Sequence, residues 1–344
     1  MNERKLGAST VLRIALTIGA LPLLSGCILF ALAPLPATVD VEVQDATRRG
    51  FDGIIVYVDQ PGGTATYPAG TISRQTLHPV GPDTLFKIGS ISKLYIAAAS
   101  VKLVDDGGLS LDDTVAALLP DLAGRIENAS TITVRMLLQH RSGIPDFIDS
   151  PGFSWIEAPQ NTRESLELID GTSARFSPDA RHDYSNTNYV LIGEVLDRTL
   201  GYSHHIYIKD EILTPLGLNN TYSLFGEVDP DDVMSGYDLS SDDADWKPAD
   251  YVLPGGSMVA SADDTGRFLR ALIDGFLFTS NEQDIYTSVY EYEHTGLLPG
   301  YQSIARYHSD IDAVVIQFTN VSGGDRWRRS ETVYNRIVRI LRRQ

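Results

Sequence analysis

Cysteine is almost absent from this sequence of 344 residues, since Cys27 is the only one. A single cysteine excludes disulfides within the chain and a cluster of thiolate metal ligands. Asp242, Asp243 and Asp245 lack the spacing of a calcium-binding loop, so we expect no metal and no cofactor. Basic residues are too few to balance the acidic ones, and the formal net charge of −17 argues against nucleic acid as a partner. The chain also lacks a Gly-x-Ser-x-Gly motif, which argues against an α/β-hydrolase nucleophile elbow.

The amino-terminal residues have the pattern of a targeting segment. Basic residues at positions 4, 5 and 13 precede an apolar run over residues 14–24, which leads into Leu24-Ser25-Gly26-Cys27. This arrangement resembles a bacterial lipoprotein signal, in which residues 1–26 are removed and Cys27 becomes the lipidated first residue. Because apolar character continues to residue 33, an uncleaved membrane-spanning anchor is the alternative. Both interpretations predict an exported protein that is attached to a membrane, with residues 27–50 as a tether.

Only six lysines are present, and one of them, Lys93, follows Ser90 by three residues at the start of an apolar stretch. Residues i and i+3 share one face of a helix, so the lysine amine would lie beside the serine hydroxyl. We expect a buried helix that begins near Ser90 and ends at Gly107-Gly108. Its amino-terminal dipole would favour an oxyanion, and burial would lower the pKa of Lys93 toward that of a base. The pair is a candidate nucleophile and base. By chance alone, a chain of this composition would contain on average about 0.5 serines that precede a lysine by three residues.

Strand patterns occur towards both ends of the chain, and helix patterns lie mainly between them. We predict strands over residues 53–59, 64–67, 287–293, 301–307 and 311–319. We predict helices over residues 134–140, 188–200, 203–213 and 262–274, and one more in the arginine-rich C-terminal segment. The simplest assembly is an α/β (α+β) fold with one antiparallel sheet covered by helices. The sheet subdomain would comprise residues 51–110 and 251–344, and residues 111–250 would form a mainly helical subdomain.

Two further motifs follow Ser90 and Lys93 in order along the chain. Tyr184-Ser185-Asn186 lies in a polar turn before a predicted helix, and His294-Thr295-Gly296 ends a β-rich segment. The second motif is expected by chance only about a few times in a hundred such chains. Together the motifs resemble those of the serine β-lactamase and penicillin-binding protein superfamily. The chain is most similar to its branch of class C β-lactamases, DD-peptidases and related esterases, from about Phe51 to the C-terminus.

This resemblance implies a β-lactamase/transpeptidase-like fold, with N- and C-terminal helices on the sheet and the active site between the two subdomains. It implies that Ser90 attacks a carbonyl and forms an acyl-enzyme, while Lys93 and Tyr184 transfer protons. Tyr184 would become a base only where Lys93 and His294 stabilise its phenolate. The implied substrate contacts are Asn186, His294, Thr295 and Gly296. The implied oxyanion hole consists of the backbone N–H groups of Ser90 and Leu297.

One departure from the family pattern bears on the substrate. His294 stands where most β-lactamases carry a lysine, and a histidine holds a substrate carboxylate only when it is protonated. We therefore expect a serine hydrolase that acts on D-alanyl peptides of peptidoglycan, as a DD-carboxypeptidase does, or on small esters, with weak β-lactam acylation. Two alternatives are a carboxylesterase without peptidase activity and a non-catalytic lipoprotein that recognises penicillin or binds the cell envelope.

Overall fold

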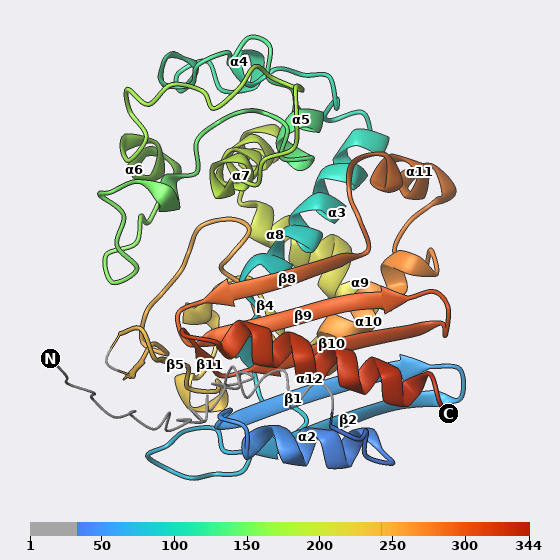
Figure 1. Ribbon diagram of the computed structural model, residues 1–344. Coiled ribbons are helices and arrows are strands. Elements are labelled where there is room, and N and C mark those ends of the chain that lie inside the picture. Colours follow the sequence, from blue (N-terminus) through green and yellow to red (C-terminus); the bar gives the residue numbers. More distant parts are fainter. Residues whose placement is uncertain (1–32, 242) are drawn as a thin grey trace, which may run out of the picture. The chain divides into compact units, whose positions relative to one another are not determined.

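A computed structural model describes residues 33–241 and 243–344 (Figure 1). The predicted signal sequence and Cys27 lie outside the described residues. All elements discussed below belong to one compact unit, Leu35–Gln344. Within the two described ranges, none of the helices has both the length and the hydropathy of a membrane span.

An antiparallel sheet of five strands is built from both ends of this unit, in the order β2-β1-β10-β9-β8. The strands are β1 Gly53–Gln60, β2 Gly63–Gly70, β8 Glu293–Leu298, β9 Tyr301–His308 and β10 Ala313–Thr319. The first six residues of β1 and all of β10 are buried. Burial on both faces explains why these two strands are largely continuous apolar runs rather than alternating ones.

Helices cover both faces of the sheet. Helix α2, Val39–Thr47, packs against β1 and β2, and α12, Arg326–Leu341, packs against α2 and β10. Helix α10, Ala262–Ile273, contacts β1, β9 and β10, and Figure 1 shows it behind the sheet, with α2 and α12 in front. A buried ion pair joins the two front helices, because Arg336 Nε and Nη2 lie 2.8 and 2.9 Å from the two carboxylate oxygens of Glu42.

The helical part surrounds the central helix α3, Ser92–Asp105, which contacts α7, α8 and α11. The other helices are α4 Val115–Leu118, α5 Val134–Leu138, α6 Thr162–Glu167, α7 Asn186–Leu200, α8 His204–Ile208, α9 Thr214–Leu216 and α11 Ser280–Val289. A π-helical segment, Lys209–Leu213, joins α8 to α9. The short strands are β3 Phe86–Lys87, β4 Thr221–Tyr222, β5 Tyr237–Asp238, β6 Ala244–Asp245, β7 Val259–Ala260 and β11 Val321–Ser322.

Most of the predicted elements are confirmed. The central helix, the helices near residues 134–140, 188–200 and 262–274 and the C-terminal helix are all present. The strands predicted over residues 53–59, 64–67, 301–307 and 311–319 correspond to β1, β2, β9 and β10. The mixed fold with an antiparallel sheet and flanking helices is likewise confirmed.

Two expectations were wrong. Residues 27–50 were predicted to be a tether, but residues 39–47 form α2, which Thr38 caps and which buries Val39, Val43 and Ala46. The segment 287–293 was predicted to be a strand, but α11 extends to Val289 and β8 begins only at residue 293. A capping box at the start of α11 explains the second error, since it favours a helix over the β-branched residues that follow.

Candidate active site

Ser90 lies in a single 3₁₀ turn, Gly89–Ile91, immediately before α3. The φ angle of Gly89 is +54°, and a Cβ atom there would lie 3.2 Å from the backbone N of Leu297. A Cβ atom on Gly296 would lie only 2.1 Å from the carbonyl oxygen of Ile88. The two glycines therefore allow β8 to pass directly against the turn that carries Ser90, which brings the backbone N of Leu297 close to that turn.

Lys93 is fully buried in the first turn of α3, and its Nζ lies 3.1 Å from Ser90 Oγ. The same Nζ donates to Asn186 Oδ1 at 2.9 Å and to the carbonyl of Gly255 at 2.8 Å. Burial lowers the pKa of Lys93 to about 7, and the nearby carboxylate of Asp146 acts in the opposite direction. A neutral amine has two N–H bonds and one lone pair, so these two acceptors leave the lone pair for the Ser90 hydroxyl. This is the arrangement of a general base.

The phenol of Tyr184 also approaches the serine, with its hydroxyl 3.0 Å from Ser90 Oγ. Its ring stacks on the ring of His140, with the centroids 4.2 Å apart. Burial raises the pKa of Tyr184 well above its ordinary value. Tyr184 is therefore a neutral phenol that donates a hydrogen bond to the serine oxygen.

Asn186 begins α7 and connects Lys93 to a carboxylate that the sequence analysis did not identify. While Asn186 Oδ1 accepts from Lys93, its Nδ2 donates to Asp146 Oδ2 at 2.9 Å. Asp146 is only 5% exposed, and burial raises the pKa of its carboxyl group. The two contacts fix which end of the Asn186 amide faces Lys93. Sequence reasoning missed Asp146 because no motif spacing relates it to residue 186, which is 40 positions away.

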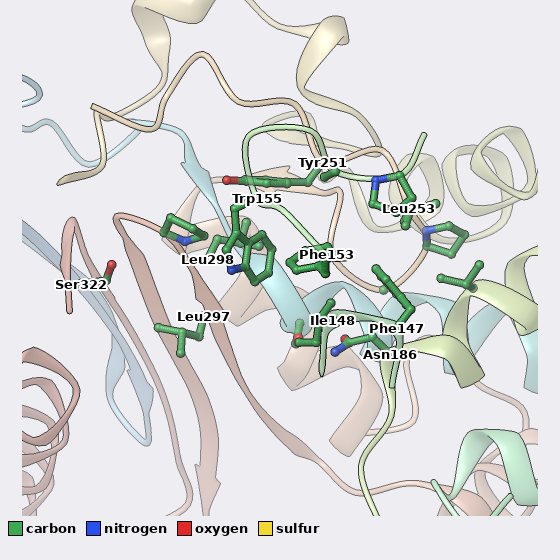
Figure 2. Close-up of a pocket in the computed structure, with 18 of the residues that line it drawn as sticks. Phe147, Ile148, Phe153, Trp155, Asn186, Tyr251, Leu253, Leu297, Leu298 and Ser322 are labelled. Carbon is green, nitrogen blue, oxygen red and sulfur yellow. The ribbon is translucent and has the colours of Figure 1, made fainter. Parts of the chain in front are cut away.

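A cavity of about 420 Å³ opens beside Ser90, and most of its wall is apolar (Figure 2). Its larger apolar side chains are Phe147, Ile148, Phe153, Trp155, Val190, Tyr251, Leu253, Leu297 and Leu298. Tyr184 and Asn186 also line it, so the cavity is continuous with the site of the predicted chemistry. The aromatic residues come from two loops and follow no helix or strand period, which is why the sequence did not reveal this wall.

The β8 residues predicted to contact substrate, His294, Thr295 and Gly296, are not among those that line this cavity. The half-buried His294 ring lies next to Tyr184, with a centroid distance of 6.1 Å, and its Nδ1 donates to the carbonyl of Thr295 at 2.5 Å. Burial, followed by the positive charge of Lys93, lowers the pKa of His294 to about 3. The expectation that His294 stabilises a Tyr184 phenolate was wrong, because its ring is neutral at physiological pH.

The geometry and the sequence agree with one family of known proteins. Residues 38–288 match the family described as Beta-lactamase. The chain belongs to this family. Its members are serine hydrolases with the β-lactamase fold, and the relatives of this chain include proteins named for DD-carboxypeptidase and for D-amino acid amidase activity.

Two curated relatives of this Beta-lactamase family member show how far the similarity extends. "Putative penicillin-binding protein PbpX" of Bacillus subtilis is 26% identical over 314 residues, which are 86% of this chain and 76% of that protein. "Putative D-alanyl-D-alanine carboxypeptidase" of Escherichia coli K12 is 28% identical over 177 residues, which are 49% of this chain and 41% of that protein. The chain thus spans less than half of the second relative.

Among solved structures, D-amino acid amidase from Ochrobactrum anthropi SV3, in complex with L-phenylalanine amide, superposes with a TM-score of 0.78. The two are 23% identical, and the match covers 89% of this chain and 97% of the amidase. At this identity the likeness shows a shared fold.

Proposed function

We propose that the protein is a serine hydrolase that forms an acyl-enzyme at Ser90 and acts on D-alanyl peptides or on small esters and amides. The observation that carries the proposal is the environment of Lys93 Nζ, whose two N–H bonds have acceptors in Asn186 and Gly255. In the neutral amine, the lone pair of Nζ faces Ser90 Oγ, which lies 3.1 Å away. A lysine that is buried in this way serves as a base at neutral pH, because its pKa is lowered to about 7.

In the acylation step, Ser90 Oγ attacks the substrate carbonyl carbon while its proton passes to Lys93 Nζ. The bond between the carbonyl carbon and the leaving group then breaks, and the proton reaches the leaving oxygen or nitrogen from Lys93 through the hydroxyl of Tyr184. Water attacks the resulting ester in the second step, gives its proton to Lys93, and releases Ser90 with its hydroxyl proton restored. Two lower barriers thereby replace one high barrier.

The backbone N–H groups of Ser90 and Leu297 are proposed to stabilise the negative oxygen of the tetrahedral intermediates. Ser90 stands in the turn that opens α3, where the partial positive charge of the helix dipole adds to the stabilisation. Loss of one such donor costs about 3 kcal/mol in comparable enzymes. Asn186 Nδ2, which Asp146 holds in orientation, has a second N–H bond that is suited to a substrate carbonyl.

A neutral His294 supports a preference for esters and amides over substrates that must anchor a carboxylate. Its pKa of about 3 leaves no positive charge at the position where a family lysine would bind the carboxylate of a penicillin or a D-alanyl peptide. We therefore propose that β-lactam acylation is slow and that carboxylesterase activity exceeds DD-carboxypeptidase activity.

A substrate panel tests this proposal. Purified protein that lacks residues 1–33 is assayed with short-chain p-nitrophenyl esters, D-amino acid amides, D-alanyl-D-alanine peptides and a chromogenic cephalosporin. We expect turnover of esters or amides that is lost in Ser90→Ala. Equal turnover by the wild type and the variant would refute the proposed chemistry.

We further propose that the protein is an exported lipoprotein that is anchored through Cys27. The motif Leu24-Ser25-Gly26-Cys27 and the preceding apolar run support this proposal. Metabolic labelling of the full chain with a palmitate analogue in a bacterial host should label the wild type and leave Cys27→Ala unlabelled. Failure to label the wild type would favour the uncleaved anchor.

A further inference from the structure

The cavity beside Ser90 has a wall of aromatic rings that contact one another. Phe153 and Trp155 meet edge to face, with ring centroids 4.9 Å apart, and Trp155 meets Tyr251 at 5.5 Å and 90°. Phe147 continues the series, since its ring lies 5.7 Å from that of Phe153. Figure 2 shows Trp155 and Phe153 below Tyr251. Rings in such edge-to-face contact form a surface that suits another aromatic ring.

A buried lysine braces the loop that supplies one side of this wall. The Nζ of Lys87 donates to the carbonyl of Lys247 at 2.7 Å and to the carbonyl of Ala249. It also lies 3.9 Å from the centroid of the Phe225 ring. These contacts immediately precede Tyr251 in the chain, so they hold the backbone that carries this side of the cavity.

The charges around the cavity are as informative as its rings. The described residues that line it include no lysine, arginine or histidine, and their single carboxylate is Asp238. A substrate carboxylate in this cavity would lose its hydration without gaining a cation, and it would face a like charge. A neutral apolar group meets neither cost.

The position of the cavity indicates which part of a substrate would enter it. It extends past the C-terminal end of β8, where Leu298, Pro299 and Ser322 line it, and His294 and Thr295 at the other end of β8 do not line it. Tyr184, through which the leaving group receives its proton, borders the cavity at one end and contacts the ring of His294, which does not line the cavity. The group that stays attached to Ser90 is therefore the one that extends into the cavity.

We infer that this cavity is an acyl-group pocket that selects uncharged aromatic acyl groups and rejects acyl groups that carry a carboxylate. The inference rests on the acyl-enzyme chemistry proposed above and adds the class of substrate to it. One methylene in an apolar pocket changes selectivity by about 10- to 200-fold. A phenyl ring that fills this pocket should therefore improve kcat/KM by at least about 100-fold over a methyl group.

Esters with a constant leaving group test the inference. The p-nitrophenyl esters of acetic, phenylacetic, butyric and succinic acid are compared by kcat/KM, each divided by its rate with hydroxide to remove intrinsic reactivity. The wild type should prefer phenylacetate to acetate by at least about 100-fold. It should also prefer butyrate to hemisuccinate, which has a similar length but carries a carboxylate, by a similar factor.

Two neighbouring substitutions provide a matched comparison. Trp155→Ala removes a ring from the wall and should reduce the preference for phenylacetate by at least about 10-fold. Ile156→Ala alters the next side chain, which is 81% exposed and outside the cavity lining, and should leave the preference within about twofold. Each preference is a ratio measured on one preparation, so partial misfolding does not affect it.

Equal normalised rates for acetate and phenylacetate would overturn the inference, and so would an equal change in Trp155→Ala and Ile156→Ala. Efficient hydrolysis of hemisuccinate would overturn its electrostatic part. If no ester is hydrolysed and a fluorophosphonate probe does not label Ser90, the acyl-enzyme proposal itself fails, and the pocket assignment fails with it. The labelling measurement thus distinguishes the two kinds of failure.

Discussion

The pH dependence of acylation should report the protonation state of Lys93. Its pKa is lowered from 10.5 to about 7 because the side chain is fully buried. At pH 7 a lysine with the ordinary pKa is neutral in about 0.03% of molecules, whereas one with a pKa of about 7 is neutral in about half. The shift corresponds to about 5 kcal/mol, which the fold supplies as desolvation of the charged form.

For a p-nitrophenyl ester, we therefore expect kcat/KM to rise with pH along a single acidic limb centred near pH 7. The direction follows from the chemistry, since only the neutral amine accepts the proton of Ser90. At pH 5 the rate should be about 100-fold below the plateau. His294 should not contribute a limb in this range, because its pKa is about 3.

Asp146→Asn should move this limb to lower pH. The carboxylate of Asp146 opposes the shift of the Lys93 pKa, so its removal favours the neutral amine further. Relative to its own plateau, the variant should be about 3- to 10-fold faster than the wild type at pH 5. Asp149→Asn is the matched control, because Asp149 lies on the short helix that Asp146 caps but pairs with Arg175 at an exposed position.

Three results would contradict the assignment of Lys93 as the general base. The limb could lie above pH 9, which would mean that Lys93 reacts as an ordinary lysine. Asp146→Asn could move the limb to higher pH, or Asp149→Asn could move it as far as Asp146→Asn does. Stopped-flow measurement of p-nitrophenolate release between pH 4.5 and pH 10 distinguishes these results.

Three more substitutions test other parts of the structure. His294→Lys should add a fixed positive charge beside the site and increase the acylation rate with a chromogenic cephalosporin by at least about 10-fold. Gly296→Ala places a Cβ atom 2.1 Å from the carbonyl oxygen of Ile88, so it should lower the free energy of unfolding by about 1 to 3 kcal/mol in urea denaturation. The control is Gly124→Ala, where a Cβ atom would have no neighbour within 4 Å, and its free energy of unfolding should be almost unchanged. Glu42→Gln removes the carboxylate that pairs with the buried Arg336 and should lower the free energy of unfolding by about 1.5 to 3 kcal/mol in the same assay.

Each of these expectations has a definite contrary result. An unchanged cephalosporin rate in His294→Lys would show that charge at this position does not limit acylation. Equal stability of the two glycine variants would contradict the close approach of β8 to the nucleophile turn. A decrease of less than about 1 kcal/mol in the free energy of unfolding of Glu42→Gln would mean that the Glu42–Arg336 pair stabilises the fold no more than an exposed ion pair does.

The proposed nucleophile and the residues around it could be predicted from sequence because the chemistry of acyl transfer restricts the residue types. A serine and a lysine three positions apart lie on one face when their segment is helical, and Tyr184-Ser185-Asn186 leads into a second helix, α7, which contacts α3. The structure places both Lys93 Nζ and the Tyr184 hydroxyl within hydrogen-bonding distance of Ser90 Oγ. Local patterns were sufficient for these two motifs because each lies at the start of a helix, where the backbone geometry is well defined.

The features that sequence could not reveal depend on contacts between distant segments. Asp146 acts through Asn186, and only the folded chain shows that these side chains meet. The aromatic wall joins Trp155 to Tyr251 across two loops that have no regular period. The neutral state of His294 follows from desolvation of its ring. Because β8 is an edge strand of the sheet, the local sequence does not indicate whether a side chain on it is buried.

The proposed function depends on a covalent acyl-enzyme at Ser90, which mass spectrometry of the protein during turnover can detect. Protein that lacks residues 1–33 is mixed with p-nitrophenyl phenylacetate, quenched in acid within milliseconds to seconds, and digested for peptide mapping. We predict a mass increase equal to one phenylacetyl group that maps to the peptide containing Ser90 and is absent from Ser90→Ala. Turnover without any adduct at Ser90, or the same turnover in Ser90→Ala, would contradict the account.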